Sequence, residues 1–407
     1  MNLNVNSETG VLKGVIVHTP GNEVSLVNPE HKDELLFDDI IFEEDARREH
    51  LDMLDIFKAA MPADGKILEI TELFLETLQD EEARKYFVES LVDRLPELNL
   101  YIVKKDLLNL DPSTLLKFVI EGSVPSGKFT LNPTPNLLFT RDLAAIVRNN
   151  VIISKPAKKA RYREALLMEA LVRFHPLFEE TKKHVIPVDD QASIEGGDVL
   201  VASEDLIIIG MSERTSFSGL MTAAKGLLRS GVETILAVDI PKQRSSMHLD
   251  TIFTFANNNE CIVFPPAITE RKNNIVALTL ENGKIISETL PSLKFALEEL
   301  MQQDFTFIEC GGKDRTRQFR EQWTDGANVF ALAPGIIVGY ERNTSTFREL
   351  EEHGYEIVNQ FEFIETYKNK EFMHEGKKIA ITFLGHELCR GRGGARCMTM
   401  PIARKTS

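Results

Sequence analysis

The sequence contains little cysteine and no long apolar run. Its 407 residues include 4 cysteines, Cys261, Cys310, Cys389 and Cys397, and no Cys-x-x-Cys pair. A disulfide framework or a zinc site is typical of more closely spaced cysteines, so we expect free thiols. No apolar stretch approaches the roughly 18 residues that span a bilayer, and residues 1–17 begin without a basic segment. The sequence therefore predicts a cytoplasmic protein with no signal peptide and no membrane association.

Basic residues are in the minority, and several common catalytic motifs are missing. Lys and Arg number 47 against 62 Asp and Glu, which gives a formal net charge of -15. This balance argues against a nucleic-acid partner, because such binding depends on Lys and Arg meeting phosphate. It is compatible with a small cationic substrate, which a negative field attracts. The chain has no G-x-x-x-x-G-K-[ST], H-E-x-x-H or G-x-S-x-G motif, which excludes the phosphate-loop, zincin and serine-elbow signatures.

A pattern of strand, turn, strand and helix recurs along the chain. Each clear copy opens with an aspartate or asparagine, enters a short apolar strand, turns, and continues as a second strand. Typical turn residues, such as Asn149-Asn150 and Pro334-Gly335, lie between the paired strands. This repetition favours an α/β fold built radially over an ordinary mixed α/β sheet. The copies cover residues 142–174, 198–228, 250–264 and 328–353, with a partial fifth at 14–18 that leads to a helix over 44–61.

Residues 72–121 depart from this pattern and are predicted to be helical. Phe87, Leu91 and Leu95 recur at intervals of four residues, which places them on one apolar helix face. We therefore expect a small helical insertion within a larger catalytic α/β domain. The predicted boundaries are 72–124 for the insertion domain, and 1–71 with 125–407 for the catalytic domain.

The segment Cys389-Arg-Gly-Arg-Gly-Gly-Ala-Arg-Cys397 is the most unusual part of the sequence. Its glycines allow the backbone to approach a ligand closely, and its three arginines lie within nine residues. Basic neighbours favour the thiolate, which is the nucleophilic form of cysteine. Cys397 is therefore a candidate nucleophile. The alternative is a solvated basic loop beside a buried cysteine.

His248 and Asp250 precede the first strand of the third copy. If the strand already begins there, the two side chains point to the same face, because side chains alternate with period two. A histidine and a carboxylate on one face can combine acid–base chemistry with cation binding. The alternative is a histidine that caps the strand and an aspartate in a turn.

Two further carboxylates take comparable places in the first and second copies. Glu195 is followed by Gly196 and Gly197, which would let another group come close to the backbone. Asp142 follows an aromatic residue and an arginine. The alternative for Glu195 is a plain turn, and the alternative for Asp142 is a surface ion pair. Radial repetition would direct such equivalent positions toward a common centre. The residues expected there are Asp142, Glu195, His248 and Asp250.

Together these motifs resemble those of the arginine deiminases, which belong to the pentein superfamily of five-bladed α/β propellers. The resemblance covers nearly the whole chain, including the helical segment, and it implies a pseudo-symmetric five-bladed propeller with a small helical insertion domain. The motifs that carry it are Asn136-Leu-Leu-Phe-Thr-Arg-Asp142, Glu195-Gly-Gly-Asp198, His248-Leu-Asp250 and Arg390-Gly-Arg-Gly-Gly-Ala-Arg-Cys397-Met-Thr-Met-Pro401.

The resemblance implies hydrolysis of L-arginine to L-citrulline and ammonia, with no metal and no cofactor. Cys397 would attack the guanidinium carbon and form a covalent thiouronium intermediate. His248 would protonate the leaving ammonia and then activate water. Asp142 and Asp250 would hold the guanidinium by hydrogen bonds, and Glu195 would raise the pKa of His248.

The resemblance also assigns the other end of the substrate. Arg161, Arg214 and Arg392 would receive the α-carboxylate, while Asn136 and Phe139 would line the amino-acid end and the aliphatic stem. The glycine-rich loop that carries Arg392 is expected to close over the substrate. The alternatives are another guanidine substrate, such as agmatine or a methylated arginine, and an inactive arginine-binding homologue. We also expect a homo-oligomer.

Overall fold

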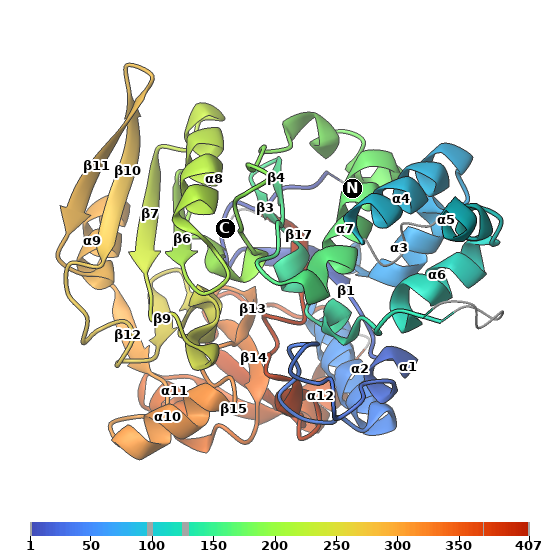
Figure 1. Cartoon of the computed structure of the whole chain (residues 1–407). Helices are drawn as coiled ribbons and strands as arrows, with labels where there is room; N and C mark the ends of the chain where they lie inside the picture. The colour runs from blue at the N-terminus through green and yellow to red at the C-terminus, as the bar shows by residue number, and fades with distance from the viewer. Residues whose placement is uncertain (1, 96–100, 124–129, 369, 406–407) are drawn as a thin grey trace.

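The computed structural model describes residues 2–95, 101–123, 130–368 and 370–405, and the chain has a mixed α/β fold (Figure 1). Within these residues the strands form five sheets. The sheets are β17-β1-β2 (Met400–Lys405, Val11–Val17, Lys66–Glu69), β3-β4 (Ala144–Val147, Asn150–Ile153), β11-β10-β7-β6-β5 (Lys284–Leu290, Ile275–Glu281, Thr234–Asp239, Leu206–Met211, Val199–Val201), β12-β9-β8 (Thr306–Glu309, Glu260–Val263, Phe253–Asn257) and β13-β14-β16-β15 (Phe330–Ala333, Ile336–Tyr340, Ile379–Phe383, Glu356–Asn359).

Every sheet contains an antiparallel pair of short strands. In four of the sheets, one strand of this pair also aligns parallel with a third strand: β1 with β2, β6 with β7, β9 with β12, and β14 with β16. A parallel neighbour requires a crossover, and helices supply it in the sheets of β1 and β6. The predicted succession of strand, turn, strand and helix is therefore confirmed in the first, second and fourth copies. The helices are α1 (Asn22–Ser25), α2 (Glu43–Ala60), α3 (Ile70–Thr77), α4 (Glu81–Arg94), α5 (Tyr101–Leu108), α6 (Pro112–Glu121), α7 (Tyr162–Phe174), α8 (Phe217–Arg229), α9 (Leu293–Met301), α10 (Arg315–Trp323), α11 (Thr344–Glu352) and α12 (Gln360–Tyr367).

Helix α8 illustrates why these segments fold as they do. The hydroxyl of Ser216 accepts a hydrogen bond from the amide of Gly219 at 3.1 Å and thereby caps the N-terminus. Leu220, Ala223 and Leu227 fall on one face and are buried against β6, β7 and β10. Burial of a leucine side chain contributes about 2 kcal/mol, so packing on the sheet holds this helix in place.

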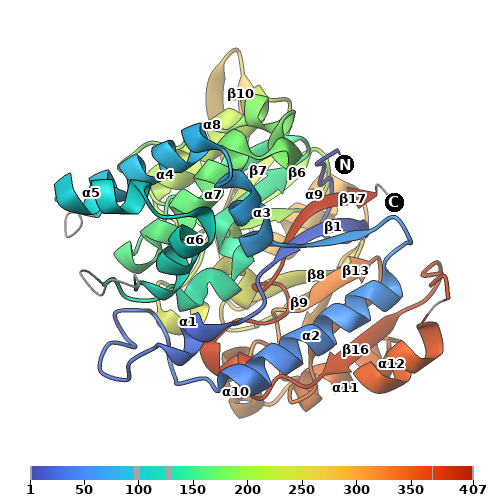
Figure 2. The ribbon, with the colours of Figure 1, turned by 90° about the vertical axis from the view of Figure 1, so that its right-hand side faces the viewer.

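Helices α3 to α6 lie together on one side of the molecule, away from α10 to α12 (Figure 2). The helical character predicted for residues 72–121 is confirmed for the described residues. These helices share one apolar cluster with α7 and with strands β3 and β4. The predicted domain boundaries stay a prediction, and residues 96–100 and 124 lie outside the described ranges.

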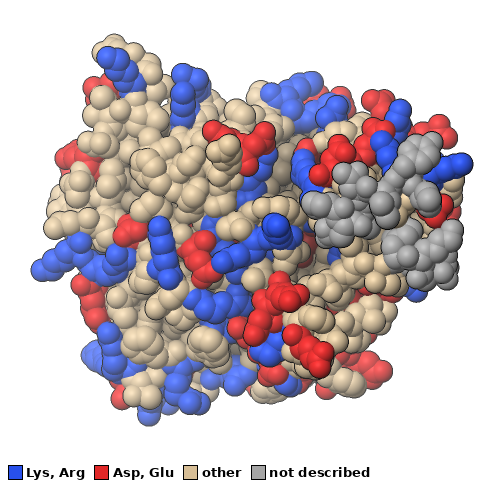
Figure 3. Space-filling view, viewed as in Figure 1, with Lys and Arg blue, Asp and Glu red and all other residues tan. Residues whose placement is uncertain are grey.

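The two ends of the chain lie in one sheet. Strand β1 runs antiparallel to β17, and Val11 pairs with Lys405. This pairing brings the N-terminal residues beside the segment that contains Cys397. Among the described residues, no helix is both long and apolar enough to cross a membrane. On the face shown in Figure 3, basic and acidic side chains are interspersed.

Candidate active site

Three short 3-10 turns bring distant parts of the sequence together. They are η3 (Thr140–Leu143), η7 (Gly196–Asp198) and η9 (Leu249–Thr251), and they lead into strands β3, β5 and β8. Turn η7 contacts both η3 and η9. Strand β8 begins only at Phe253, so the condition for His248 and Asp250 to alternate along it is not met; the alternative is confirmed, with His248 as the N-cap of η9 and Asp250 within this turn. The carboxylate of Asp198 accepts the amide of Leu249 at 2.8 Å, which stabilises this turn.

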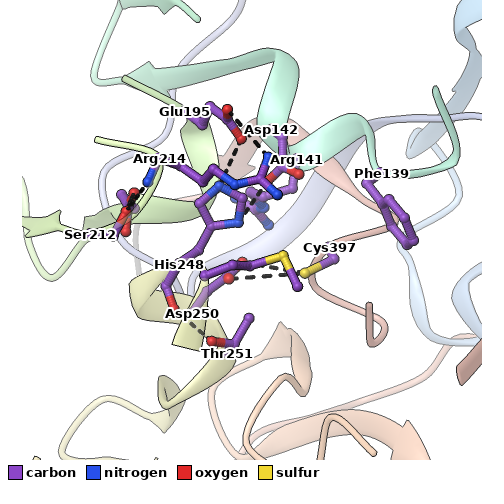
Figure 4. A network of polar contacts seen from close by, with 12 residues as sticks. Phe139, Arg141, Asp142, Glu195, Ser212, Arg214, His248, Asp250, Thr251 and Cys397 are labelled. Carbon is purple, nitrogen blue, oxygen red and sulfur yellow. Dashed lines mark hydrogen bonds and ion pairs between the residues drawn. The ribbon is translucent and has the colours of Figure 1, made fainter. Parts of the chain in front are cut away.

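His248 lies between two carboxylates and is 1% exposed. Its Nε2 is 2.9 Å from Oε2 of Glu195, and its Nδ1 is 3.6 Å from Oδ1 of Asp142 (Figure 4). Burial lowers the pKa of His248, but the charge of Asp142 and the hydrogen bond with Glu195 outweigh it and raise this pKa to about 9. Burial also raises the pKa of Glu195, yet the hydrogen bond with His248 brings it down to about 2. His248 is therefore an imidazolium near neutral pH.

Cys397 lies next to the carboxylate of Asp250. Its Sγ is 3.9 Å from Oδ1 and 3.8 Å from Oδ2 of Asp250, and its amide donates to Oδ1 of Asn328 at 3.0 Å. The side-chain amide of Asn328 also donates to the carbonyl of Asp250 at 2.8 Å, so one asparagine fixes both backbones. Burial, followed by the charges of Asp250 and Asp142, raises the pKa of Cys397 well above its ordinary value. Cys397 is therefore a thiol in this arrangement.

The two aspartates are each held on one side by an arginine of the chain. Arg161 donates to Oδ2 of Asp142, and Arg396 donates to Oδ2 of Asp250 at 2.7 Å. Oδ1 of Asp142 makes no hydrogen bond within the described residues, although it is buried. Each carboxylate thus keeps one oxygen with hydrogen-bonding capacity beside Cys397 and His248, which suits a planar cation with several N–H groups.

Cys397 and His248 line one small cavity with a volume of about 20 Å³. Such a space holds about one water molecule, so a larger substrate enters only after part of the wall moves. All five predicted substrate-binding residues lie in this wall. The cavity is lined by Leu36, Asn136, Phe139, Asp142, Arg161, Arg214, Arg244, Met247, His248, Gly391, Arg392 and Cys397.

The arginines in the wall differ in the partners that they already have. Arg161 ion-pairs with Asp142, with Glu164 at 2.8 Å and with Glu195 at 3.8 Å. Arg214 is 3.8 Å from Glu195. Arg392 has no ion pair among the described residues; its guanidinium lies 3.6 Å from the ring centroid of Trp323, and its Nε and Nη1 are buried without a hydrogen bond. Of these three, Arg392 is the most available for an anion.

The predicted close approach at the glycines of η7 is present. A Cβ on Gly197 would lie 2.8 Å from Oδ1 of Asp142 and 2.8 Å from Cγ of His248. A Cβ on Gly393 would lie 2.4 Å from the ring of Phe139. Glycine at these two positions therefore leaves the space that the site side chains occupy.

Sequence reasoning did not identify several residues of the site. Leu36, Arg244 and Met247 line the cavity, while Glu8 and Asn328 hold the residues around Cys397. Asn328 opens the fourth copy, so its equivalence to Asp142 and Asp250 could have indicated it. Glu8 stands in no motif and carries no comparable signal.

One set of side chains in the site could also hold a metal ion. Asp142, Glu195 and His248 each offer a ligand atom, and these atoms lie within 4.8 Å of one another. In the structure the same atoms face each other and Arg161. Nε2 of His248 and Oε2 of Glu195 are hydrogen-bonded to each other, so two of these three residues already use a ligand atom within the cluster.

A buried cysteine and a histidine paired with carboxylates line one cavity of an α/β fold, which makes this a candidate site of a cysteine-dependent enzyme. Solved structures of similar fold include an amidinotransferase from Microseira wollei (TM-score 0.55, 12% identity, 100% of this chain and 98% of that one) and a DDAH from Pseudomonas aeruginosa (TM-score 0.51, 14% identity, 96% and 99%). At these identities the likeness concerns the fold alone.

Sequence comparison is more specific. The arginine deiminase family model matches residues 33–404. The chain is 35% identical to the arginine deiminase of Bacillus cereus over 437 aligned positions, which cover 99% of this chain and 98% of that protein. The chain belongs to the arginine deiminase family.

Proposed function

We propose that the chain hydrolyses L-arginine to L-citrulline and ammonia through a covalent intermediate on Cys397. One observation carries this proposal: Cys397, His248 and Asp142 line a single cavity whose wall also contains Arg392, a cation without an ion pair among the described residues. Family membership supports the same reaction. The cavity wall thus offers the carboxylate of Asp142 for a guanidinium and the cation Arg392 for a carboxylate.

The guanidinium would bind between Asp142 and Asp250. Their Oδ1 atoms would accept its N–H groups, which holds the central carbon near Sγ of Cys397. The positive charge of the substrate would offset the two carboxylates and lower the pKa of the thiol. The thiol would release its proton to solvent when the substrate binds, and the resulting thiolate would attack the guanidinium carbon.

His248 would act first as an acid and then as a base. As an imidazolium it donates a proton to the departing nitrogen, and ammonia leaves the carbon that is now bonded to sulfur. The neutral imidazole then takes a proton from the attacking water, and the C–S bond breaks to give citrulline. Glu195 keeps His248 protonated before the first step, since the pair is hydrogen-bonded at 2.9 Å.

The substrate carboxylate would bind Arg392 and Arg214. Arg161 would contribute after sharing or releasing Asp142, to which it now donates. Asn136 and Phe139 would contact the amino-acid end and the stem; at present the side-chain amide of Asn136 donates to the carbonyl of Leu35 at 2.6 Å. Since the cavity is smaller than arginine, the loop that carries Arg392 would open to admit it.

We further propose that the five sheets are the blades of a pseudo-symmetric propeller, with residues 72–124 as a helical insertion domain. The recurring antiparallel pair in each sheet supports this arrangement. A cytoplasmic location and a homo-oligomeric state stay predictions.

A citrulline assay of the purified chain tests the proposed activity. We expect citrulline and ammonia in equal amounts from L-arginine at about pH 5 to 9. Cys397→Ser should lower kcat by at least about a thousandfold, because the hydroxyl is a much weaker nucleophile. Cys389→Ser is the matched control: Cys389 is buried in the same segment, contacts Arg342 at 2.6 Å, and should be dispensable for turnover.

Two results would contradict the proposal: no citrulline anywhere in that pH range, or normal kcat in Cys397→Ser. Acid quenching of a single turnover followed by mass spectrometry addresses the inactive-homologue alternative. An adduct on Cys397 supports catalysis, and its absence during measurable turnover would remove the covalent mechanism.

A further inference from the structure

Arg396, the residue before Cys397, is enclosed between two carboxylates. It is 1% exposed. Its Nη1 donates to Oδ2 of Asp250 at 2.7 Å, while its Nε and Nη2 donate to the two oxygens of Glu8 at 3.1 Å each. Its Nη2 also donates to the carbonyl of Val199 at 3.1 Å. The guanidinium thus forms a forked pair at one end and a single strong hydrogen bond at the other.

Glu8 is itself fixed in place. Its amide donates to the carbonyl of Val201 at 2.7 Å, and its Oε1 accepts the amide of Val201 at 3.1 Å. Burial raises the pKa of Glu8, but the charge of Arg396 outweighs it and lowers this pKa to about 2. A charged glutamate in the bend before β1 therefore sets the direction in which Arg396 presents its Nη1.

Asp250 needs a partner of this kind. It is fully buried, and burial raises its pKa above the ordinary value, although Arg396 and then His248 act to lower it. A protonated Asp250 would lose most of its attraction for a guanidinium cation. Arg396 provides the one hydrogen bond from a cation to this carboxylate within the described residues. The charged or titratable groups that face Asp250 are Arg396, His248, Asp142, Arg141, Asp325 and Cys397.

We propose that Arg396 is a positioning residue for the reaction, because it keeps Asp250 ionised and correctly oriented beside Cys397, and that Glu8 in turn orients Arg396. This inference rests on the proposed function for the identity of the substrate. It assigns a role to two residues that touch no substrate. It also explains why the N-terminal segment and the segment before β17 meet at this point.

Arginine binding to an inactive background tests the inference without turnover. In Cys397→Ser, the Kd of L-arginine is measured by calorimetry across pH. We expect Arg396→Met in this background to weaken binding by at least about 30-fold at neutral pH, and to move the acidic loss of binding upward by at least about one pH unit. Arg396→Lys keeps the charge but not the forked hydrogen bonds. The pH at which half of its L-arginine binding is lost should therefore lie between the values for Arg396→Met and the parent.

Two further variants make the result specific. Arg404→Met is the matched control: Arg404 belongs to the same buried cluster and donates to the carbonyl of Gly10 at 2.6 Å, but it does not contact Asp250. Its midpoint should equal that of the parent. Glu8→Gln removes the carboxylate that orients Arg396, so L-arginine binding at neutral pH should weaken, while the loss of a negative charge should keep the pH midpoint of binding from moving upward as in Arg396→Met.

The outcomes separate the two proposals. An unchanged midpoint in Arg396→Met, or an equal upward shift in Arg404→Met, overturns the role of Arg396. If Arg396→Met does not fold, as judged by circular dichroism, Arg396→Lys and Glu8→Gln decide: an unshifted midpoint in Arg396→Lys overturns the role of Arg396, and unchanged binding at neutral pH in Glu8→Gln overturns the role of Glu8. Absence of citrulline from the wild-type chain counts against the proposed function only, since the pH dependence of binding is measured independently.

Discussion

At the scale of single residues, recognition of an α-carboxylate depends on which arginine is not already paired. Arg161 meets three carboxylates and Arg214 lies near two, whereas Arg392 contacts the Trp323 ring. Burial lowers the pKa of Arg392. A buried guanidinium with unused donors gains much from an anion, because it recovers hydrogen bonds lost on desolvation.

Arg392→Ala should therefore discriminate between substrates with and without a carboxylate. We expect the KM for L-arginine to rise by at least about tenfold, and inhibition by agmatine to change by less than about threefold. Steady-state kinetics with agmatine as competitor measures both values. Arg390→Ala is the matched control, because Arg390 pairs with Asp39 and Glu387 outside the cavity. Equal losses for both guanidines would reassign the carboxylate site.

The sequence was informative about those residues whose chemistry is local. The sequence alone shows a cysteine flanked by arginines and glycines. It also shows the aspartates that open successive repeats. Glu8 is not, because its function depends on Arg396, which is 388 positions away. Glu8 and Arg396 come together because β1 pairs with β17 in one sheet. No local sequence pattern predicts this pairing.

At the scale of elements, the site is built from 3-10 turns rather than from strand ends. The positions of the paired strands and of α7 and α8 followed from apolar periodicity and turn residues. The local conformation of His248 and Asp250 did not, since the period-two rule assumes a strand that begins later, at Phe253. The hydrogen bond from Leu249 to Asp198, a tertiary contact, determines the turn.

Turn η7 provides a prediction at this scale. Gly197→Ala should lower kcat by at least about a hundredfold, because the added Cβ would displace Asp142 and His248 by several tenths of an ångström. The backbone of Gly197 does not lie in the left-handed region, so alanine adds little strain of its own. Thermal unfolding is the control and should change by only a few degrees. Full activity would show that the two side chains tolerate the displacement.

At the scale of the whole molecule, buried histidines couple stability to pH in opposite directions. His18 lies between Glu23 at 3.0 Å and Glu69 at 2.9 Å; burial lowers the pKa of His18, but these hydrogen bonds raise it to about 10. His50 on α2 is fully buried, both of its ring nitrogens lack partners within the described chain, and burial lowers its pKa to about 3. The first histidine is charged in the folded state and the second is neutral.

For His50, the direction in which stability changes with pH depends on which state, folded or unfolded, takes up a proton. Below about pH 6.5 the unfolded chain protonates this histidine while the folded chain does not, so stability falls as the pH drops toward 3. The loss is up to about 1.4 kcal/mol per pH unit. His18 acts in the other sense: its contribution is complete below about pH 6.5 and declines as the pH rises toward 10.

His50→Leu should therefore make the molecule less sensitive to acid. We expect its Tm to lie near the wild-type value at about pH 7.5 and to exceed it progressively below about pH 6, by on the order of 2 °C per pH unit. The difference between the two proteins isolates His50, because Glu8 and Glu195, which also lose stabilisation in acid, are common to both. His31→Gln, on the exposed segment before α2, is the matched control and should follow the wild type. A constant difference in Tm between wild type and His50→Leu at every pH would mean that His50 takes up its proton in the folded state, through local opening of α2, and the acid sensitivity would then belong to the carboxylates alone.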